Sequence, residues 1–305
     1  ITILVKYPKA RATDHCEIHY HDIGDYLDRN AKLKIIKDFR SYKNIPWTLI
    51  QPNEKNDWIN QRDGVFDTLL PLAPDKKFDL KAQSAFLTYA IGVATNRDAW
   101  VSGFSKADVA QNMRDMIDVY NAQIGRDVVE KSEQKISWTV NLRKDKDNNI
   151  VHSFAENAFV TTTYRPFNKM ALYYDKPFIE RPGLFEKLFK NNINNRIICF
   201  SAVKTPTVLI AKDYPNLHYL GDTQCFPLYW YEENKHENKR TLFDEENKGR
   251  WTRRDGITDW FLKEVRQRFS GAKNLTKEDI FYYIYGLLHS EDYRNRFADD
   301  LRKSL

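Results

Sequence analysis

Apolar residues at helical spacing alternate along this chain with short continuous apolar runs. The spacing is clearest after Ser105, where the repeating residues are Val109, Met113, Met116, Ile117 and Tyr120. Steps of three and four residues are typical of a helix with one buried face, and Ser105 with Asp108 resembles a capping box at its start. Apolar runs at 196–200 and 207–211 instead indicate buried strands. The chain is therefore predicted to be α/β, in the mixed α+β sense.

Further helices are predicted from their first residues. Asp28 is a suitable N-cap for a helix over 29–39, and Thr258 for another that ends near Gly271. Thr276 precedes Asp279 by three residues, which predicts a capping box and a helix whose aromatic residues pack in the core. A short helix is also expected around 184–189, and a last one over 293–301, so the chain should close with packed helices.

The first part of the chain predicts a sheet edge and a boundary. Residues 1–5 and 17–21 have strand composition, and the polar turn between them predicts a hairpin. From 46 to 80 the periodicity fades and four prolines interrupt it, which indicates irregular connecting structure. We therefore expect two domains, over residues 1–45 and 46–305.

Composition excludes several classes of protein. With 42% hydrophobic and 30% charged residues, the chain is expected to fold with a solvated surface. No apolar run reaches the ~18 residues that span a bilayer, and no signal peptide begins the chain. A cytoplasmic location without membrane association is therefore expected. Because the sequence begins without Met, it is expected to continue a longer protein.

The positive charge is concentrated in one segment. The whole chain carries a formal charge of +6, and residues 161–215 hold nine basic and four acidic residues. A basic segment within a balanced chain is typical of a polyanion partner, although a solvated face of a globular domain has the same composition. Residues 232–256 are also rich in charge but balanced, which predicts an exposed loop.

Motifs for a complete catalytic site are absent from the sequence. The 11 glycines never fall two residues apart, so no Gly-x-Gly turn for a dinucleotide or methyl donor exists, and no phosphate loop precedes Gly-Lys-Ser. An adenine methyltransferase also needs an Asn/Asp-Pro-Pro-aromatic element, and no Pro-Pro pair occurs. No catalytic residue, resident cofactor or metal is therefore assigned to this chain.

Two weaker sites have alternatives that the sequence leaves open. The group of His15, Cys16, His19 and His21 has metal-binding residue types, but no second cluster completes a ligand set, which favours an aromatic-rich sheet edge. Asp222 with Glu233 and Lys235 has the composition of a divalent-metal nuclease site. The same Glu-x-Lys triplet recurs twice further along that charged stretch, which favours chance over a nuclease.

Several strings in this sequence resemble segments of the type ISP restriction-modification family, in the order in which that family has them. They are Tyr20–Leu27 (YHDIGDYL), Asp57–Arg62 (DWINQR), Gly92–Trp100 (GVATNRDAW), Tyr164–Phe167 (YRPF), Leu172–Asp175 (LYYD), Gln224–Tyr229 (QCFPLY) and Ile280–Ser290 (IFYYIYGLLHS). The matches extend from about residue 17 to the end of the chain.

The resemblance implies which of the family's domains this chain contains and which lie upstream of it. Family members join a nuclease, a helicase-like translocase, an adenine methyltransferase and a target-recognition domain in one chain. Residues 1–45 would then be the carboxy-terminal end of the methyltransferase domain, with the end of its sheet, and residues 46–305 the target-recognition, or specificity, domain. S-adenosylmethionine, ATP and Mg are expected in upstream domains, which would also be its partners in the same polypeptide.

Candidates for contact with DNA come from three segments. Guanidinium and amide groups suit phosphates and base edges, so the basic segment contributes Arg165, Lys169, Arg181 and Arg196, each of which has a structural ion pair as its alternative. A polar loop between two strands contributes Ser201, Lys204 and Thr205, and the loop after an apolar segment contributes Thr95, Asn96 and Arg97.

We therefore expect sequence-specific recognition of double-stranded DNA that positions a target adenine for methylation by the upstream domain. The alternatives are a metal-dependent nuclease and a docking module that couples motor to methyltransferase without contacting DNA.

Overall fold

The structure is a computed structural model, and it describes residues 2–6, 8–9, 16–127, 130–189, 195–201, 206–233, 251–269 and 271–303. The chain divides into two compact units, Ile1–Phe66 and Asp67–Leu305. The division lies 21 residues beyond the predicted boundary at 45/46. That the first residues belong to a methyltransferase domain stays a prediction.

The first unit holds a short helix and a two-stranded sheet. It contains β1 (Ile18–Tyr20), α1 (Arg29–Phe39), the 3-10 turn η1 (Tyr42–Asn44) and β2 (Thr48–Ile50). The Asp28 side chain accepts a hydrogen bond from the Ala31 amide at 2.7 Å, which confirms the predicted N-cap. The predicted hairpin is wrong, because β1 pairs antiparallel with β2 and residues 2–6 form no strand. Long-range strand pairing overrides the local pattern here.

A motif in this unit is a structural ion pair. In the string Asp57–Arg62, the Arg62 guanidinium donates two hydrogen bonds to the Asp57 carboxylate, at 2.9 and 3.2 Å. The Asn53 side chain accepts from the Asp57 amide at 2.9 Å and fixes the same turn. None of the described residues up to Phe66 is buried, so this unit folds around local hydrogen bonds more than around a core.

The second unit contains the remaining elements. Its strands are β3 (Ala90–Ile91), β4 (Ser102–Gly103), β5 (Phe159–Arg165), β6 (Asn168–Tyr173), β7 (Ile197–Ser201), β8 (Thr207–Ala211), β9 (Tyr214–Pro215), β10 (Gln224–Pro227), β11 (Tyr229–Glu233) and β12 (Trp251–Asp255). Its helices are α2 (Asp98–Val101), α3 (Lys106–Asn121), α4 (Val140–Asp147), α5 (Phe185–Leu188), α6 (Asp259–Arg268), α7 (Lys277–His289), α8 (Glu291–Arg296) and α9 (Ala298–Lys303), with 3-10 turns η2 (Phe66–Thr68), η3 (Glu156–Ala158) and η4 (Lys176–Phe178).

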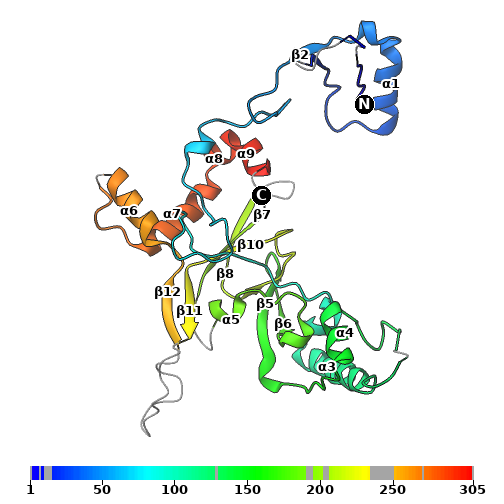
Figure 1. Cartoon of the computed structure of the whole chain (residues 1–305), viewed down its shortest axis with the longest axis vertical. Helices are drawn as coiled ribbons and strands as arrows, with labels where there is room; N and C mark the ends of the chain where they lie inside the picture. The colour runs from blue at the N-terminus through cyan, green and yellow to red at the C-terminus, as the bar shows by residue number, and fades with distance from the viewer. Residues whose placement is uncertain are drawn as a thin grey trace. The chain divides into compact units, whose positions relative to one another are not determined.

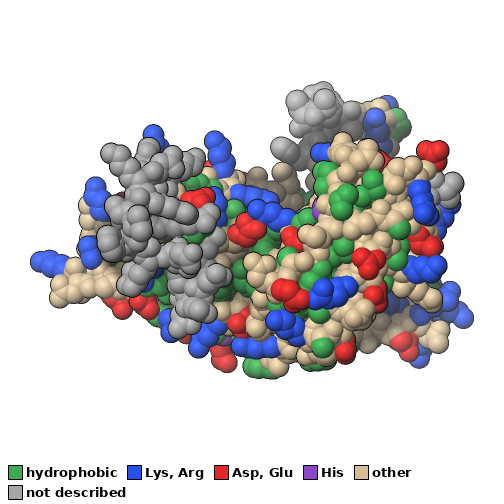
Figure 2. All heavy atoms as spheres, turned by 90° about the horizontal axis from the view of Figure 1, so that it is seen from below, with side chains coloured by type: hydrophobic (Ala, Val, Ile, Leu, Met, Phe, Trp, Pro, Cys, Tyr) green, Lys and Arg blue, Asp and Glu red, His purple; other side chains and the backbone are tan. Residues whose placement is uncertain are grey.

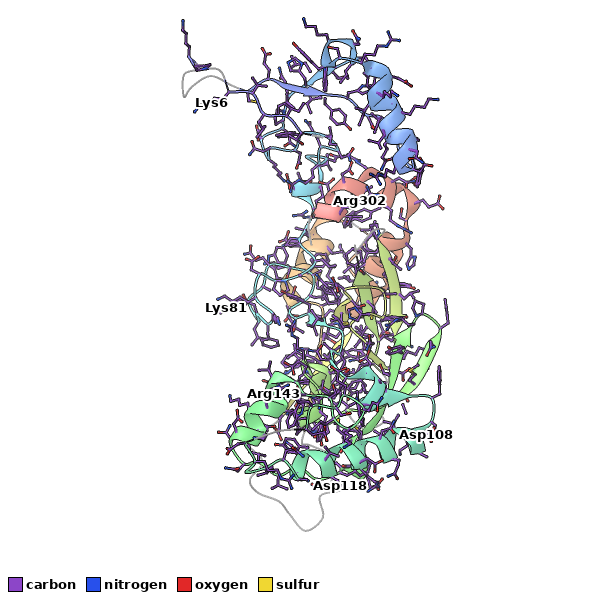
Figure 3. All side chains as sticks on the ribbon, turned by 90° about the vertical axis from the view of Figure 1, so that its right-hand side faces the viewer. Lys6, Lys81, Asp108, Asp118, Arg143 and Arg302 are labelled. Carbon is purple, nitrogen blue, oxygen red and sulfur yellow. The ribbon has the colours of Figure 1, made fainter. Side chains whose placement is uncertain are left out.

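Two four-stranded sheets and a ribbon form the centre of this unit. One sheet has the order β4-β6-β5-β9, the other β3-β10-β7-β8, and β11 pairs with β12. The helices α3 and α4 lie beside the first sheet, whereas α6 and α7 lie at the other end of the unit (Figure 1). In Figure 3, Asp108 and Asp118 mark the course of α3, and Arg143 marks α4. The fold is mixed α/β, as the sequence predicted.

The core forms where the predicted helices meet the sheets. The five apolar residues predicted for α3 are all buried, and Ser105 caps the helix by accepting from the Asp108 amide at 3.2 Å. Phe281 of α7 is fully buried, and its ring lies 6.1 Å from that of Phe86 in an edge-on arrangement. The capping box of Thr276 and Asp279 is present. Both helices are therefore confirmed, but the prediction that the aromatic residues of α7 pack in the core is wrong for Tyr282 and Tyr283, which are 38% and 67% exposed.

The charged stretch 232–256 differs from its prediction at both ends. Residues 229–233 and 251–255 pair in antiparallel register, with Tyr229 opposite Asp255 and Glu233 opposite Trp251. The ends therefore form a ribbon instead of an exposed loop, because Trp and Tyr favour strands and pack across them. Residues 234–250 lie outside the described residues. In the part of the chain that is described, no helix is both long and apolar enough to cross a membrane.

Candidate nucleic-acid interface

The β5–β6 hairpin has an irregular end. Arg165 pairs with Asn168, which leaves Pro166 and Phe167 as a two-residue turn. A register shift between Thr163 and Arg165 places an extra residue, Tyr164, on the β5 side. A bulge of this kind bends a strand and changes the direction of its side chains, and bulges are frequent next to functional sites. The hairpin end therefore presents its side chains differently from a regular ladder.

Arg165 is held in place beside this turn. Its Nη1 donates to the backbone oxygen of Tyr164 at 2.7 Å and to Oδ1 of Asn216 at 3.2 Å. The guanidinium carbon lies 4.1 Å from the centre of the Tyr164 ring. Stacking on an aromatic ring orders a guanidinium without neutralising it. Arg165 forms no ion pair with an acid in the described part of the chain, and it is only half-buried.

The loop after β3 is brought against the same region by a close backbone approach. A Cβ at Gly92 would lie 2.5 Å from the backbone oxygen of Asn216, so only glycine fits there. The Val93 amide donates to the Pro215 oxygen at 2.8 Å, and the Leu217 amide donates back to the Val93 oxygen at 2.9 Å. Gly92, the first residue of the GVATNRDAW string, therefore fixes the loop that follows it.

A chain of side-chain hydrogen bonds joins this loop to Arg165. The Thr95 hydroxyl donates to the Asp98 carboxylate, and Nδ2 of Asn216 donates to the other carboxylate oxygen of Asp98 at 3.4 Å. Asn216 in turn accepts from Arg165. Thr95 itself is buried, so it supports the surface from below and does not lie on it. We define the hairpin surface as Asn96, Arg165, Phe167, Lys169 and Arg181. These residues lie in or next to the segments that this chain of hydrogen bonds connects.

Asn96 and Arg97 point to opposite environments. Asn96 is exposed and has a φ of +53°, a left-handed conformation that asparagine tolerates better than most residues. Arg97 is only 4% exposed, and its Nη2 donates to the Thr139 hydroxyl at 2.6 Å. Burial lowers the pKa of Arg97 to about 10, against the opposing effect of Glu180. Asn96 can therefore contact a ligand, whereas Arg97 supports the fold.

Arg181 and Lys169 complete the exposed cations. Arg181 exchanges backbone hydrogen bonds with Ala94, at 2.9 and 3.4 Å, which places it next to Thr95. Its side chain is exposed and forms no ion pair with any described residue. Lys169 lies opposite Thr163 on the hairpin and pairs with Asp213 at 2.6 Å. Its side chain is 64% exposed, so this pair is of the weak surface type.

The remaining predicted residues lie elsewhere. Arg196 precedes β7 in the other sheet, where its guanidinium is 3.9 Å from the Glu278 carboxylate and 5.8 Å from the Tyr282 ring. Ser201, the last residue of β7, is 1% exposed. Lys204 and Thr205 lie outside the described residues. The structure therefore brings Thr95, Asn96, Arg165, Lys169 and Arg181 together, and it does not place Arg196 or Ser201 among them.

Two residues of this region escaped the sequence analysis. Asn216 connects Asp98 to Arg165, yet it is a single amide with no motif around it. Phe167 was part of a recognised string, and the Pro before it signals a turn, so an exposed aromatic at the hairpin end was accessible to prediction. Neither residue type is conspicuous by itself.

The surface around the hairpin is chemically mixed. A shallow hollow on the same sheet contains Lys169, and Nζ of Lys106 lies 4.8 Å from the centre of the Phe159 ring at its wall. Figure 2 shows one face of the whole chain, on which basic, acidic and apolar side chains are intermixed. Lysines beside aromatic and apolar side chains, as in this hollow, suit contact with bases as well as phosphates.

In the part of the chain that is described, no arrangement of side chains supports the metal site or the nuclease site. Among the residues that the structure describes, no group of three or more His, Cys, Asp and Glu is placed to hold a metal ion. His15 and Lys235 are outside those residues. Glu233 is described, and it pairs with Trp251 in the β11–β12 ribbon.

Comparisons with known proteins identify relatives. Residues 84–305 match the family described as Type ISP C-terminal specificity domain. A solved structure of the ATP-dependent Type ISP restriction-modification enzyme LlaBIII bound to DNA is 32% identical, with a TM-score of 0.76, over 95% of this chain and 18% of that one. No curated protein matches.

Two further solved structures resemble the chain. One is a nuclease-deletion mutant of the Type ISP restriction-modification enzyme LlaGI in complex with a DNA substrate mimic, 34% identical with a TM-score of 0.75, over 95% of this chain and 26% of that one. The other is a DrdV–DNA complex, 28% identical with a TM-score of 0.77, over 94% of this chain and 28% of that one. This chain thus spans less than a third of each relative.

Proposed function

Because this chain belongs to the family of Type ISP C-terminal specificity domains, we propose that it recognises a short sequence in duplex DNA through the hairpin surface. The observation that carries the proposal is the hydrogen-bonded support from Thr95 through Asp98 and Asn216 to the half-buried Arg165, next to the exposed side chains of Asn96, Lys169 and Arg181. The three relatives are described as bound to DNA or a DNA mimic, which supports the same partner here.

Each exposed side chain suits a stated task. Arg165 is held by its Nη1 and by stacking, so its remaining donors have a fixed direction, as hydrogen bonding to a guanine edge requires. Asn96 offers an amide that can form two hydrogen bonds with the major-groove edge of an adenine, at N6 and N7. Lys169 and Arg181 are exposed cations suited to phosphates, which position a protein on DNA without specifying sequence.

Methyl transfer is not proposed for this chain itself, but we expect it to follow from DNA binding by this chain. We propose that binding at the hairpin surface positions a target adenine for methylation by an upstream domain of the same polypeptide. S-adenosylmethionine, ATP and Mg would act in upstream domains, and this chain supplies the choice of sequence. The shares of 18–28% of the relatives' chains are compatible with such a division.

The test is selection from a randomised duplex library by the 305-residue chain at two salt concentrations. Enrichment of one short motif, with affinity that falls steeply as salt rises, is the expected result. Salt-sensitive binding without enrichment of a motif would instead indicate that the chain binds the phosphate backbone of DNA without choosing a sequence. No binding would favour a docking module, and cleavage that requires magnesium would favour a nuclease.

A further inference from the structure

The turn of the β5–β6 hairpin holds a residue that the turn itself disfavours. Proline fixes a negative φ at Pro166, and Phe167 follows with a φ of +63°. This order of signs is that of a type II turn, whose third residue is usually Gly or Asn because other side chains crowd the backbone there. Folding therefore gives no reason for an aromatic residue at this position.

The Phe167 ring is also almost fully in solvent. It is 98% exposed, and no ring or cation contact to it exists among the described residues. The nearby Phe159 is different, because its ring lies 5.4 Å from that of Tyr173 and contributes to the interior of the sheet. An exposed aromatic in a strained conformation at the end of a hairpin indicates a binding role, since both features cost stability in the free protein.

The neighbours of the ring identify the class of partner. Arg165 and Lys169 lie on the two strands beside it, and Asn168 completes the turn. A protein partner would be expected to need a broader apolar patch around such a ring, whereas here Arg165, Asn168 and Lys169 flank the turn and the Tyr164 ring is covered by the Arg165 guanidinium. Cations on both sides of a single aromatic suit a nucleic acid, in which phosphates surround stacked bases.

We propose that Phe167 inserts its ring between two adjacent base pairs of the bound duplex and partly unstacks them. This inference rests on the proposed function, and it adds a contact that reads the stacking of a base step and not its hydrogen-bonding edge. The support from Asn216 through Arg165 holds the strand from which the ring projects. The position of the ring at a turn of only two residues restricts its direction, as a wedge requires.

The first test measures affinity for the selected duplex at several salt concentrations. Phe167→Ala is expected to weaken binding about 5- to 150-fold at every salt concentration, because alanine removes one stacking contact. The slope of affinity against salt should not change, since no phosphate contact is lost. Phe167→Trp should retain most of the affinity. Phe269→Ala is the matched control, because Phe269 is 61% exposed at the end of α6.

The second test reports the DNA directly. A duplex with 2-aminopurine at successive positions should show a rise in fluorescence at one base step with the unchanged chain and with Phe167→Trp, and none with Phe167→Ala. Phe167→Asn separates folding from binding, because asparagine tolerates the positive φ. Its melting temperature should equal or exceed that of the unchanged chain while its affinity falls as for alanine.

The outcomes separate this inference from the proposed function. If the unchanged chain selects a motif but Phe167→Ala binds it as well as Phe269→Ala does, the wedge is excluded and recognition stands. A changed salt slope for Phe167→Ala would also overturn the wedge. If the unchanged chain binds no duplex, the proposed function fails, and the wedge fails with it.

Discussion

The hairpins β5–β6 and β7–β8 come from the same basic segment, yet their surroundings are opposite. Every residue of β7 is buried, and next to the start of β8 Arg294 of α8 donates to the Pro206 oxygen at 3.0 Å. The end of β5–β6 has an exposed Phe167 and a half-buried Arg165. Two hairpins of one basic segment therefore differ in exposure, because β7 lies inside its sheet between β10 and β8, whereas the β5–β6 turn holds the exposed Phe167.

The largest expected effect concerns the core beside β10, the strand that pairs with β7. Phe281→Ala should lower the free energy of unfolding by about 3–5 kcal/mol, because it leaves a cavity where α7 packs against the interior. Urea denaturation followed by circular dichroism measures this loss. Tyr283→Ala on the same helix is the control, since Tyr283 is 67% exposed and its removal should change stability by less than about 0.5 kcal/mol. Equal losses in the two variants would contradict the packing described here.

Alkaline pH should lower the stability of the sheet that contains the β5–β6 hairpin. Burial raises the pKa of both Tyr173 and Tyr214 to about 12. A raised folded pKa means that their contribution is complete below pH 10 and is lost as the pH rises towards 12. Arg97, whose pKa is lowered to about 10, acts in the opposite direction over this window. The melting temperature is expected to fall from pH 10 to 12, and Tyr214→Phe should make the fall smaller.

The next effect compares one arginine from each hairpin region. Arg165→Ala should weaken binding to the selected duplex by about 1–3 kcal/mol and relax the choice of base at one position. Arg196→Ala should leave the affinity and the selected motif unchanged, because Arg196 faces Glu278 and Tyr282. Fluorescence anisotropy and a repeated library selection provide both measurements. A larger loss of affinity for Arg196→Ala than for Arg165→Ala would mean that DNA binds at the surface around Arg196 and not at the β5–β6 hairpin.

The smallest effect is expected at Lys169. Its pair with Asp213 is exposed, so Lys169→Ala should change stability by less than about 1 kcal/mol. Loss of one phosphate contact should reduce the salt slope of DNA binding by about 0.9, uniformly across sequences. Lys81→Ala, an exposed lysine elsewhere in the second unit, serves as the control and should leave the slope unchanged.

Local signals predicted much of the fold. The N-caps Asp28, Ser105, Thr258 and Thr276 each begin a helix as expected, since a cap and the first turn after it are neighbours in sequence. The partner of β1 was predicted wrongly, because the segment that pairs with it lies about thirty residues further along the chain. Strand pairing at that distance leaves no local pattern.

The candidate surface was less accessible to prediction. Arg97 was grouped with Asn96, and only the structure separates a 4% exposed guanidinium from its exposed neighbour. Arginine is seldom buried, so a sequence favours the surface for it. Asn216 acts through contacts with Asp98 and Arg165, which are distant in sequence. Such a residue becomes visible only when the fold brings its partners together.

Photo-crosslinking tests most directly whether DNA binds at the hairpin surface or at the surface around Arg196. A benzoylphenylalanine placed at Phe167 in one preparation and at Tyr282 in another would be irradiated in complex with the selected duplex. A covalent DNA adduct is expected from position 167 and none from position 282, which lies beside Arg196. An adduct from position 282 without one from position 167 would contradict this expectation.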